Sequence, residues 1–256
     1  MTFAYICFKF AYLLIWLLNT VMEPKIIFED DSLFVVEKPS GWISNDADTT
    51  TTQPVLQTWV REHFDYPLKG DREMRDGIVH RLDKETSGIL LVAKTLRAFE
   101  SLQAQFKDRQ IQKTYIALLH GKVTPETGEI KALVGRLPWR KDRFGVVPNG
   151  RESVSNYKVL KFYPGNNAGH SLVEFSPKTG RTHQIRIHAK HIGHAIVGDE
   201  FYAGRKTARN DRKWCPRLFL HAASIKFTHP ITGKEMEFKS ELPGDLSTAL
   251  KTLEKN

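Results

Sequence analysis

The fold of this chain is decided by one stretch in its first half, which reads His80-Arg81-Leu82-Asp83-Lys84-Glu85-Thr86-Ser87-Gly88-Ile89-Leu90-Leu91-Val92-Ala93-Lys94. Its residues 88–93 form a continuous apolar run, which is typical of a strand buried on both faces. The residues before the run place one carboxylate, Asp83, close to three basic side chains. A nearby cation keeps a carboxylate ionised against desolvation, as a nucleophile or base in a closed pocket requires. The alternative interpretation is a solvated loop with ordinary surface ion pairs.

Outward from this stretch, hydrophobic patterning predicts further strands and a smaller number of helices. Strands are expected at 25–28, 33–37, 88–93, 114–119, 157–162, 171–175, 224–228 and 235–238. Helices are expected at 54–64, at 96–106 with Thr95 as the N-cap, at 182–192 with Gly193 as the stop, and at 246–253. The strands do not alternate regularly with helices, which favours an α+β fold over a doubly wound sheet. Residues 22–256 contain no repeat or long linker and are predicted to form one domain.

The composition narrows the class of protein. The 256 residues carry a formal net charge of +9, with 41% hydrophobic and 26% charged residues. These fractions indicate a globular protein, and the positive charge favours nucleic acid over a membrane surface as the partner. The two cysteines, Cys7 and Cys215, exclude a disulfide scaffold and a zinc ribbon, so a reducing compartment is expected. Dinucleotide-binding, P-loop and nucleophile-elbow motifs are absent from the sequence.

The first 21 residues differ from the rest of the chain. They are almost wholly apolar, with Lys9 as their only charge. The uncharged run at 10–21 is shorter than the roughly 20 residues of a membrane span, and no small-residue cleavage site precedes Met22. Three interpretations are open: a mis-assigned start with Met22 as the true one, a membrane-associated leader, or a core segment. We favour the mis-assigned start.

A second polar segment, residues 179–188, opens the helix predicted at 182–192. It places Arg181, His183 and Gln184 at the positive end of a helix, which suits a phosphate or a carboxylate. The alternative is a basic amphipathic helix on the surface. Four histidines lie nearby, but no carboxylate or cysteine accompanies them at metal-ligand spacing, so no metal site is expected. These histidines are His183, His188, His191 and His194.

Two basic stretches contain aromatic residues, one at 131–151 with Trp139 and Phe144 and one at 205–217 with Trp214. Cations for phosphates and aromatic faces for splayed bases suit single-stranded or looped RNA. The alternative for each stretch is a solvated loop. The sequence thus indicates an RNA-binding surface without specifying the RNA.

Several segments together resemble the RluA-type pseudouridine synthase family. The stretch that begins His80-Arg81-Leu82-Asp83 resembles its central motif, and Lys38-Pro39-Ser40-Gly41 resembles its early K-P-x-G segment. The remaining segments that resemble the family, in its order, are Lys113-Thr114-Tyr115, Gly180-Arg181-Thr182-His183-Gln184-Ile185-Arg186, Gly193 to Asp199 with Tyr202, and His221-Ala222 with Phe227 to Gly233. The resemblance covers about residues 25 to 240.

The resemblance implies isomerisation of uridine to pseudouridine in structured RNA without a cofactor or metal. Asp83 is then the essential carboxylate, acting either as a nucleophile on the sugar or as a base at C2′. Tyr115 is expected to stack on the target uracil, Arg181 to pair with Asp83, Ile185 to pack against the base, and Arg81 to fill the stack that the flipped uridine leaves. Further substrate contacts are expected from His80, His183, Gln184, Arg140 and Arg143.

The resemblance also implies a central mixed, largely antiparallel sheet flanked by helices, with a basic RNA-binding cleft. After Met22 no room remains for the N-terminal S4 domain of many relatives, so we expect the short form of the family, which acts on tRNA, rRNA or both. We expect a cytoplasmic monomer without an obligate protein partner. Two other functions stay open: an RNA-binding protein or RNA chaperone that acts without turnover, and a membrane-surface protein anchored by residues 1–21.

Overall fold

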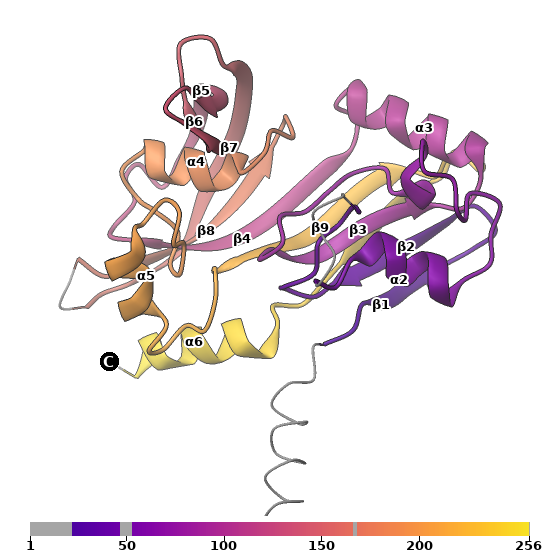
Figure 1. The fold of residues 1–256 in the computed structure, drawn as a ribbon. Coiled ribbons are helices and arrows are strands. Elements are labelled where there is room, and N and C mark those ends of the chain that lie inside the picture. Colours follow the sequence, from indigo (N-terminus) through magenta and orange to yellow (C-terminus); the bar gives the residue numbers. More distant parts are fainter. Residues whose placement is uncertain (1–21, 47–52, 166–167, 256) are drawn as a thin grey trace, which may run out of the picture.

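The structure, a computed structural model, describes residues 22–46, 53–165 and 168–255. Within these residues ten strands form one mixed sheet in the order β1-β2-β3-β9-β4-β8-β7-β5-β6, with β10 paired to β9 (Figure 1). The strands are β1 (Lys25–Glu29), β2 (Leu33–Lys38), β3 (Ser87–Ala93), β4 (Gln112–His120), β5 (Thr127–Leu137), β6 (Arg140–Val146), β7 (Arg151–Tyr163), β8 (His170–Pro177), β9 (Leu220–Thr228) and β10 (Glu235–Lys239). The helices are α2 (Leu56–His63), α3 (Leu96–Lys107), α4 (Gln184–His191), α5 (Arg205–Asp211) and α6 (Gly244–Glu254), with a 3₁₀ turn η1 (Arg75–Gly77).

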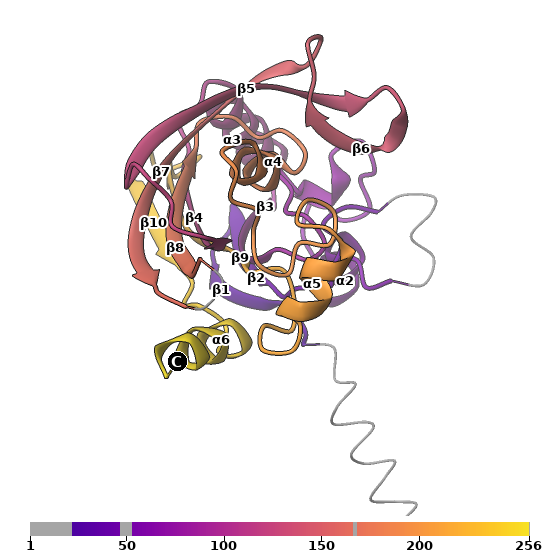
Figure 2. The ribbon, with the colours of Figure 1, turned by 90° about the vertical axis from the view of Figure 1, so that its left-hand side faces the viewer.

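The strand pairing confirms the predicted α+β architecture with a largely antiparallel sheet. Among the described strand pairs only β3 and β9 run parallel, where Ser87 lies opposite His221 and Gly88 opposite Ala222. Helices α2 and α3 lie at the end of the sheet that holds β1 to β3, and α4 and α5 lie at the other end (Figure 1). There the strands β5, β6 and β7 wrap around α4 (Figure 2).

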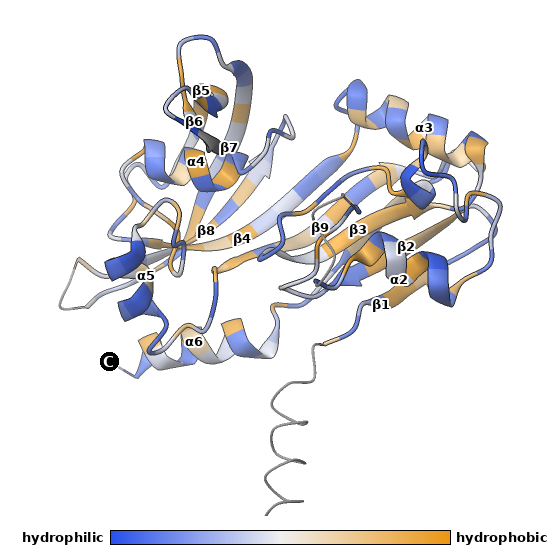
Figure 3. Ribbon diagram, viewed as in Figure 1, coloured by the Kyte–Doolittle hydropathy of each residue, from blue (hydrophilic) through white to orange (hydrophobic). Residues whose placement is uncertain are grey.

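Two hydrophobic clusters form the core, one at each end of the sheet. The first joins β2 and β3 to α2 and α3, and the second joins β4, β8 and the start of β9 to α4 and α6. All seven residues of β3 are buried, as the apolar run predicts (Figure 3). The side chain of Tyr115 packs against both clusters, so β4 carries it to the boundary between the two halves of the molecule.

Most predicted elements are present, each with its ends shifted by a few residues. Thr95 caps α3 as predicted, because its side chain accepts a hydrogen bond from the backbone N–H of Ala98. The sequence analysis missed β5, β6 and α5, which lie largely in the two basic stretches. The loop interpretation of 131–151 is therefore wrong. Strand β5 buries only Ile130 and Val134, too few apolar positions for a clear alternating pattern.

Helix α4 is shorter than the predicted helix at 182–192. It starts at Gln184 because His183 has left-handed backbone torsions of φ 55° and ψ 21°, which a helix does not accommodate. Its end agrees with the prediction, since Gly193 follows with φ 90°. Residues 181–183 therefore lie in a turn before α4, and their side chains do not follow the spacing of the helix.

The interpretations of residues 1–21 concern residues that lie outside the described part of the chain. None of the helices in the described part is both long enough and apolar enough for a membrane crossing.

The parallel pairing of β3 with β9 depends on a glycine. Gly88 has φ 117°, and a Cβ there would collide with the backbone of Ala222. We expect Gly88→Ala to lower the free energy of unfolding by about 3 kcal/mol or more, since strain and overlap add. The matched control is Gly41→Ala, with φ 91° and open space around the new methyl group, which retains only the torsional cost. Urea unfolding measures the free energy of unfolding of both variants. Equal decreases in the two would refute close packing between β3 and β9 at Gly88.

Candidate active site

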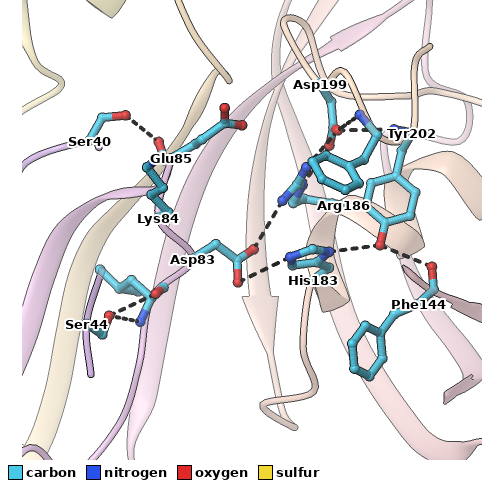
Figure 4. A network of polar contacts seen from close by, with 12 residues as sticks. Ser40, Ser44, Asp83, Lys84, Glu85, Phe144, His183, Arg186, Asp199 and Tyr202 are labelled. Carbon is cyan, nitrogen blue, oxygen red and sulfur yellow. Dashed lines mark hydrogen bonds and ion pairs between the residues drawn. The ribbon is translucent and has the colours of Figure 1, made fainter. Parts of the chain in front are cut away.

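Asp83 lies in the loop that leads into β3, with 16% of its side chain exposed. Ser44 fixes the residue before it, because its hydroxyl donates to the Leu82 carbonyl at 2.8 Å and accepts the Leu82 N–H at 3.0 Å. These contacts hold the loop from one side (Figure 4). The side chain of Asp83 points away from them, toward the other half of the molecule.

The segment 38–41 fixes the residues after Asp83. The buried Nζ of Lys38 donates to the carbonyl of Lys84 at 3.3 Å, and the backbone N–H of Gly41 donates to the same carbonyl at 2.8 Å. The hydroxyl of Ser40 donates to the Glu85 carbonyl at 2.8 Å. The K-P-x-G segment, to which the sequence analysis assigned no role, therefore positions the loop of Asp83.

Two side chains from the region of α4 face the Asp83 carboxylate. Nη1 of Arg186 lies 3.7 Å from Oδ2, and Nε2 of His183 lies 4.0 Å from Oδ1. Both distances exceed a hydrogen bond, so Arg186 acts on the carboxylate through its charge and His183 through its position. Helix α4 and the loop before β3 pack in different core clusters, so the site lies between the two halves of the fold.

Arg186 is buried and is held by a second carboxylate. Its Nε and Nη2 donate to the two oxygens of Asp199 at 2.8 Å each, and the Asp199 side chain is fully buried. Burial opposes the guanidinium charge, but the hydrogen bonds and charge of Asp199, together with Asp83, hold the pKa of Arg186 above its ordinary value. Arg186 is therefore a fixed positive charge that faces the Asp83 carboxylate.

The predicted pair between Arg181 and Asp83 is wrong in this structure, where Arg186 takes that position. Arg181 lies in the turn before α4, and its Nε donates to the Glu152 carbonyl of β7 at 3.2 Å. It still lines the same cavity. Both arginines belong to the motif that the sequence analysis quoted. The start of α4 at residue 184 decides which of them reaches Asp83.

The cavity in front of Asp83 has a volume of about 530 Å³. Asp83 is the one carboxylate among the described residues that line it. Against this single negative charge stand seven basic side chains: Arg81, Lys107, Arg109, Lys113, Lys178, Arg181 and Arg186. The cations from the end of α3 and the start of β4 belong to neither basic stretch of the sequence. Folding gathers them at the cavity.

Three of the predicted site residues form the cavity wall. Tyr115 is half-buried, and burial together with the charge of Asp83 raises its pKa. The side chain of Ile185 is buried at the start of α4. His80 accepts the backbone N–H of Leu91 on Nε2 at 3.0 Å and packs against the ring of Phe106. Burial, with the charge of Lys113, lowers the pKa of His80 to about 3, so its ring is neutral.

Gln184 also lines the cavity, but its amide is already engaged. The buried Gln184 uses its amide within the protein, since Oε1 accepts from the hydroxyl of Thr179 at 2.7 Å and Nε2 donates to the carbonyl of Val154 at 3.0 Å. Arg140 and Arg143 lie on β6 and do not line the cavity. Nη1 of Arg143 donates to the Phe201 carbonyl at 3.4 Å, and its guanidinium covers the Phe201 ring.

The described residues contain no group of three His, Cys, Asp or Glu side chains close enough to hold a metal ion. His188 lies inside the protein, where Nε2 shares a hydrogen bond of 2.8 Å with the hydroxyl of Ser153.

Comparison with known proteins agrees with this geometry. Residues 32–191 match the profile of a family described as RNA pseudouridylate synthase. The chain is 39% identical over 217 residues to an uncharacterized RNA pseudouridine synthase of Chloroflexus aurantiacus, covering 85% of this chain and 65% of the relative. It is 38% identical to ribosomal large subunit pseudouridine synthase D of Zymomonas mobilis, covering 90% and 72%.

A solved structure titled human RNA pseudouridylate synthase domain containing 1 is similar to the whole fold. Its TM-score is 0.67 at 26% identity, and the match covers 93% of this chain and 97% of the human one.

Substitution of Asp199 tests whether the buried charge of Arg186 depends on this carboxylate. We expect Asp199→Asn to lower the free energy of unfolding by about 3 kcal/mol, because it leaves a buried cation short of its counter-charge. Glu200→Gln is the matched control, since Glu200 lies next in sequence and pairs with Arg205 in an exposed contact of 3.6 Å. We expect it to change stability by about 0.5 kcal/mol or less. Chemical denaturation compares the two, and similar losses would contradict the burial of the Arg186 charge.

Proposed function

The chain belongs to the RNA pseudouridylate synthase family, and we propose that Asp83 carries the isomerisation of uridine to pseudouridine in RNA. The observation that carries this proposal is the single carboxylate of a basic cavity, with Arg186 3.7 Å away and itself anchored by Asp199. A carboxylate in this position stays ionised while RNA covers it.

The reaction exchanges one glycosidic bond for another. The C1′–N1 bond breaks, uracil rotates, and a bond from C5 to C1′ forms, after which C5 loses a proton and N1 gains one. Asp83 acts either as a nucleophile at C1′ or as a base that removes the C2′ proton to give a glycal. Both routes need an ionised carboxylate, which the charge of Arg186 favours.

Tyr115 and Ile185 supply the walls for the uracil. Because the pKa of Tyr115 is raised, its phenol is neutral at physiological pH and offers an uncharged ring face for stacking. Ile185 supplies an apolar contact from α4. The pairing with Asp83 that the sequence analysis gave to Arg181 is proposed for Arg186 instead.

Arg81 is proposed to replace the flipped base. It precedes Asp83 by two residues, its side chain is exposed at the cavity, and it has no hydrogen-bond partner or ion pair within the described residues. Flipping a base costs a few kcal/mol, and a planar guanidinium that enters the vacated stack offsets part of this cost.

RNA binding is proposed to use the cavity cations together with the two basic stretches, in which Arg140 is exposed on β6. The name of the Zymomonas mobilis relative refers to the large ribosomal subunit, which supports a ribosomal RNA substrate for this chain; transfer RNA is the other substrate that we propose to test. We propose a cytoplasmic location, where both kinds of RNA are present. Action as a monomer without a protein partner remains a prediction, as do the substrate contacts of His80 and His183.

Tritium release from RNA that carries 5-tritiated uridine tests the reaction. We expect release by the wild-type protein on bulk transfer or ribosomal RNA and none by Asp83→Asn, which keeps the shape but removes the charge. Binding of RNA should be retained by the variant, because Asp83 is an anion among cations. Release by both proteins would exclude Asp83 as the essential carboxylate. Binding without release by either would instead identify an RNA-binding protein without turnover.

Salt dependence tests the proposed RNA surface. We expect Lys107→Gln/Arg109→Gln, at the cavity rim, to weaken RNA binding and to reduce the slope of log K against log salt by about 1.5, because two phosphate contacts are lost. The control Lys234→Gln/Lys251→Gln removes two exposed cations outside the cavity and should leave the slope unchanged. Equal effects of both pairs would mean that net charge, and not this rim, binds the RNA.

A further inference from the structure

The hydroxyl of Tyr202 joins the hairpin of β5 and β6 to the side chains that face Asp83. It donates to the Phe144 carbonyl of β6 at 3.1 Å, and it lies 3.0 Å from Nδ1 of His183 (Figure 4). The other ring nitrogen of His183, Nε2, faces Oδ1 of Asp83. One tyrosine hydroxyl therefore contacts a histidine whose far side faces the carboxylate.

The tyrosine itself is held at several points. Its backbone N–H donates to Oδ1 of Asp199 at 3.1 Å, and its ring lies 5.2 Å from the guanidinium carbon of Arg186. Its position is thus tied to the same buried pair that supplies the cation at Asp83. The ring of His183 in turn lies edge-on to the rings of Phe144 and Phe201, with centroids 6.2 and 6.0 Å away.

These contacts constrain the proton on His183. A phenol has one hydrogen, and here it is donated to the Phe144 carbonyl. The contact between Tyr202 and His183 is then a hydrogen bond only if Nδ1 carries the proton and donates to the phenol oxygen. In the neutral ring Nε2 is left unprotonated toward Asp83. The opposite tautomer would lose the bond to Phe144 and would not gain one with Asp83, since 4.0 Å is too long.

We propose that Tyr202 is a positioning residue of the active site, which fixes the tautomer of His183 so that a nitrogen lone pair, and not an N–H group, faces Oδ1 of Asp83. Oδ2 faces Arg186, and Oδ1 is then the oxygen available to the ribose. An oxygen without a donor is the stronger base and nucleophile. The proposal rests on the proposed function for its catalytic meaning, but the tautomer can be measured by itself.

The charges around His183 agree with a neutral ring. Asp83 and Asp199 favour its protonation, whereas burial, Arg186 and Arg81 oppose it, and the net effect lowers the pKa of His183. At neutral pH the ring therefore has one proton, and Tyr202 decides which nitrogen carries it.

Nitrogen-15 NMR of the histidine rings tests the tautomer in the whole protein at neutral pH. His183→Asn assigns the signals, because the His183 resonances disappear in its spectrum; asparagine also tolerates the left-handed backbone. We expect wild-type His183 to be neutral with the proton on Nδ1, and Tyr202→Phe to move protonation toward Nε2. A wild-type ring that is charged or protonated on Nε2 would overturn the proposal, and so would a tautomer that Tyr202→Phe does not change.

Single-turnover isomerisation gives the functional readout. We expect Tyr202→Phe to slow the isomerisation step about tenfold without changing RNA affinity, because an Nε2–H group turned toward Oδ1 would stabilise its negative charge and make it a weaker base and nucleophile. In the His183→Asn background the same change should cause no further loss. Multiplicative losses in the double variant would show that Tyr202 does not act through His183.

Tyr157→Phe is the matched control. It removes a similar tyrosine bond, to the Pro125 carbonyl at 3.2 Å, away from the site, and it should leave the isomerisation rate unchanged. If the wild-type protein releases no tritium, the proposed function fails, while the NMR result still decides the tautomer.

Discussion

The carboxylate of Asp83 faces a buried cation across the cavity, and a buried cation must itself be stabilised by a counter-charge. In this protein the cation is Arg186, and Asp199 binds it through two hydrogen bonds of 2.8 Å. The cation that faces Asp83 thus depends on a second, fully buried carboxylate, which does not line the cavity. This arrangement also explains why a short helix, α4, is wrapped by three strands: its position sets the distance between Arg186 and Asp83.

The two core clusters hold the two sides of the site in place. One cluster supports β3 and the loop of Asp83, and the other supports α4, while Tyr115 packs against both. Side chains that face each other across the cavity therefore come from elements that pack in different core clusters. Packed elements on both sides hold the guanidinium of Arg186 and the ring of His183 at 3.7 and 4.0 Å from Asp83 without hydrogen bonds to it.

The hairpin of β5 and β6 serves two purposes in this fold. Its outer surface carries exposed cations and Trp139, whose side chain is 75% exposed, and these suit a nucleic acid. Its inner edge contributes the Phe144 carbonyl that Tyr202 binds. The proposed RNA-binding surface and the histidine beside Asp83 are thus joined by two consecutive hydrogen bonds.

The sequence by itself determined the buried strand β3, most other strands and the α+β class, because these follow from local patterns, and one ordered set of motifs was enough to single out Asp83 as the proposed catalytic carboxylate. It could not choose between Arg181 and Arg186, since that choice depends on the left-handed turn at His183 and on packing between segments far apart in the chain. The hairpin of β5 and β6 was missed because few of its residues are buried. The cavity cations near the end of α3 and the link from Tyr202 to Phe144 were decided only by the tertiary structure, since long-range packing brings these groups together.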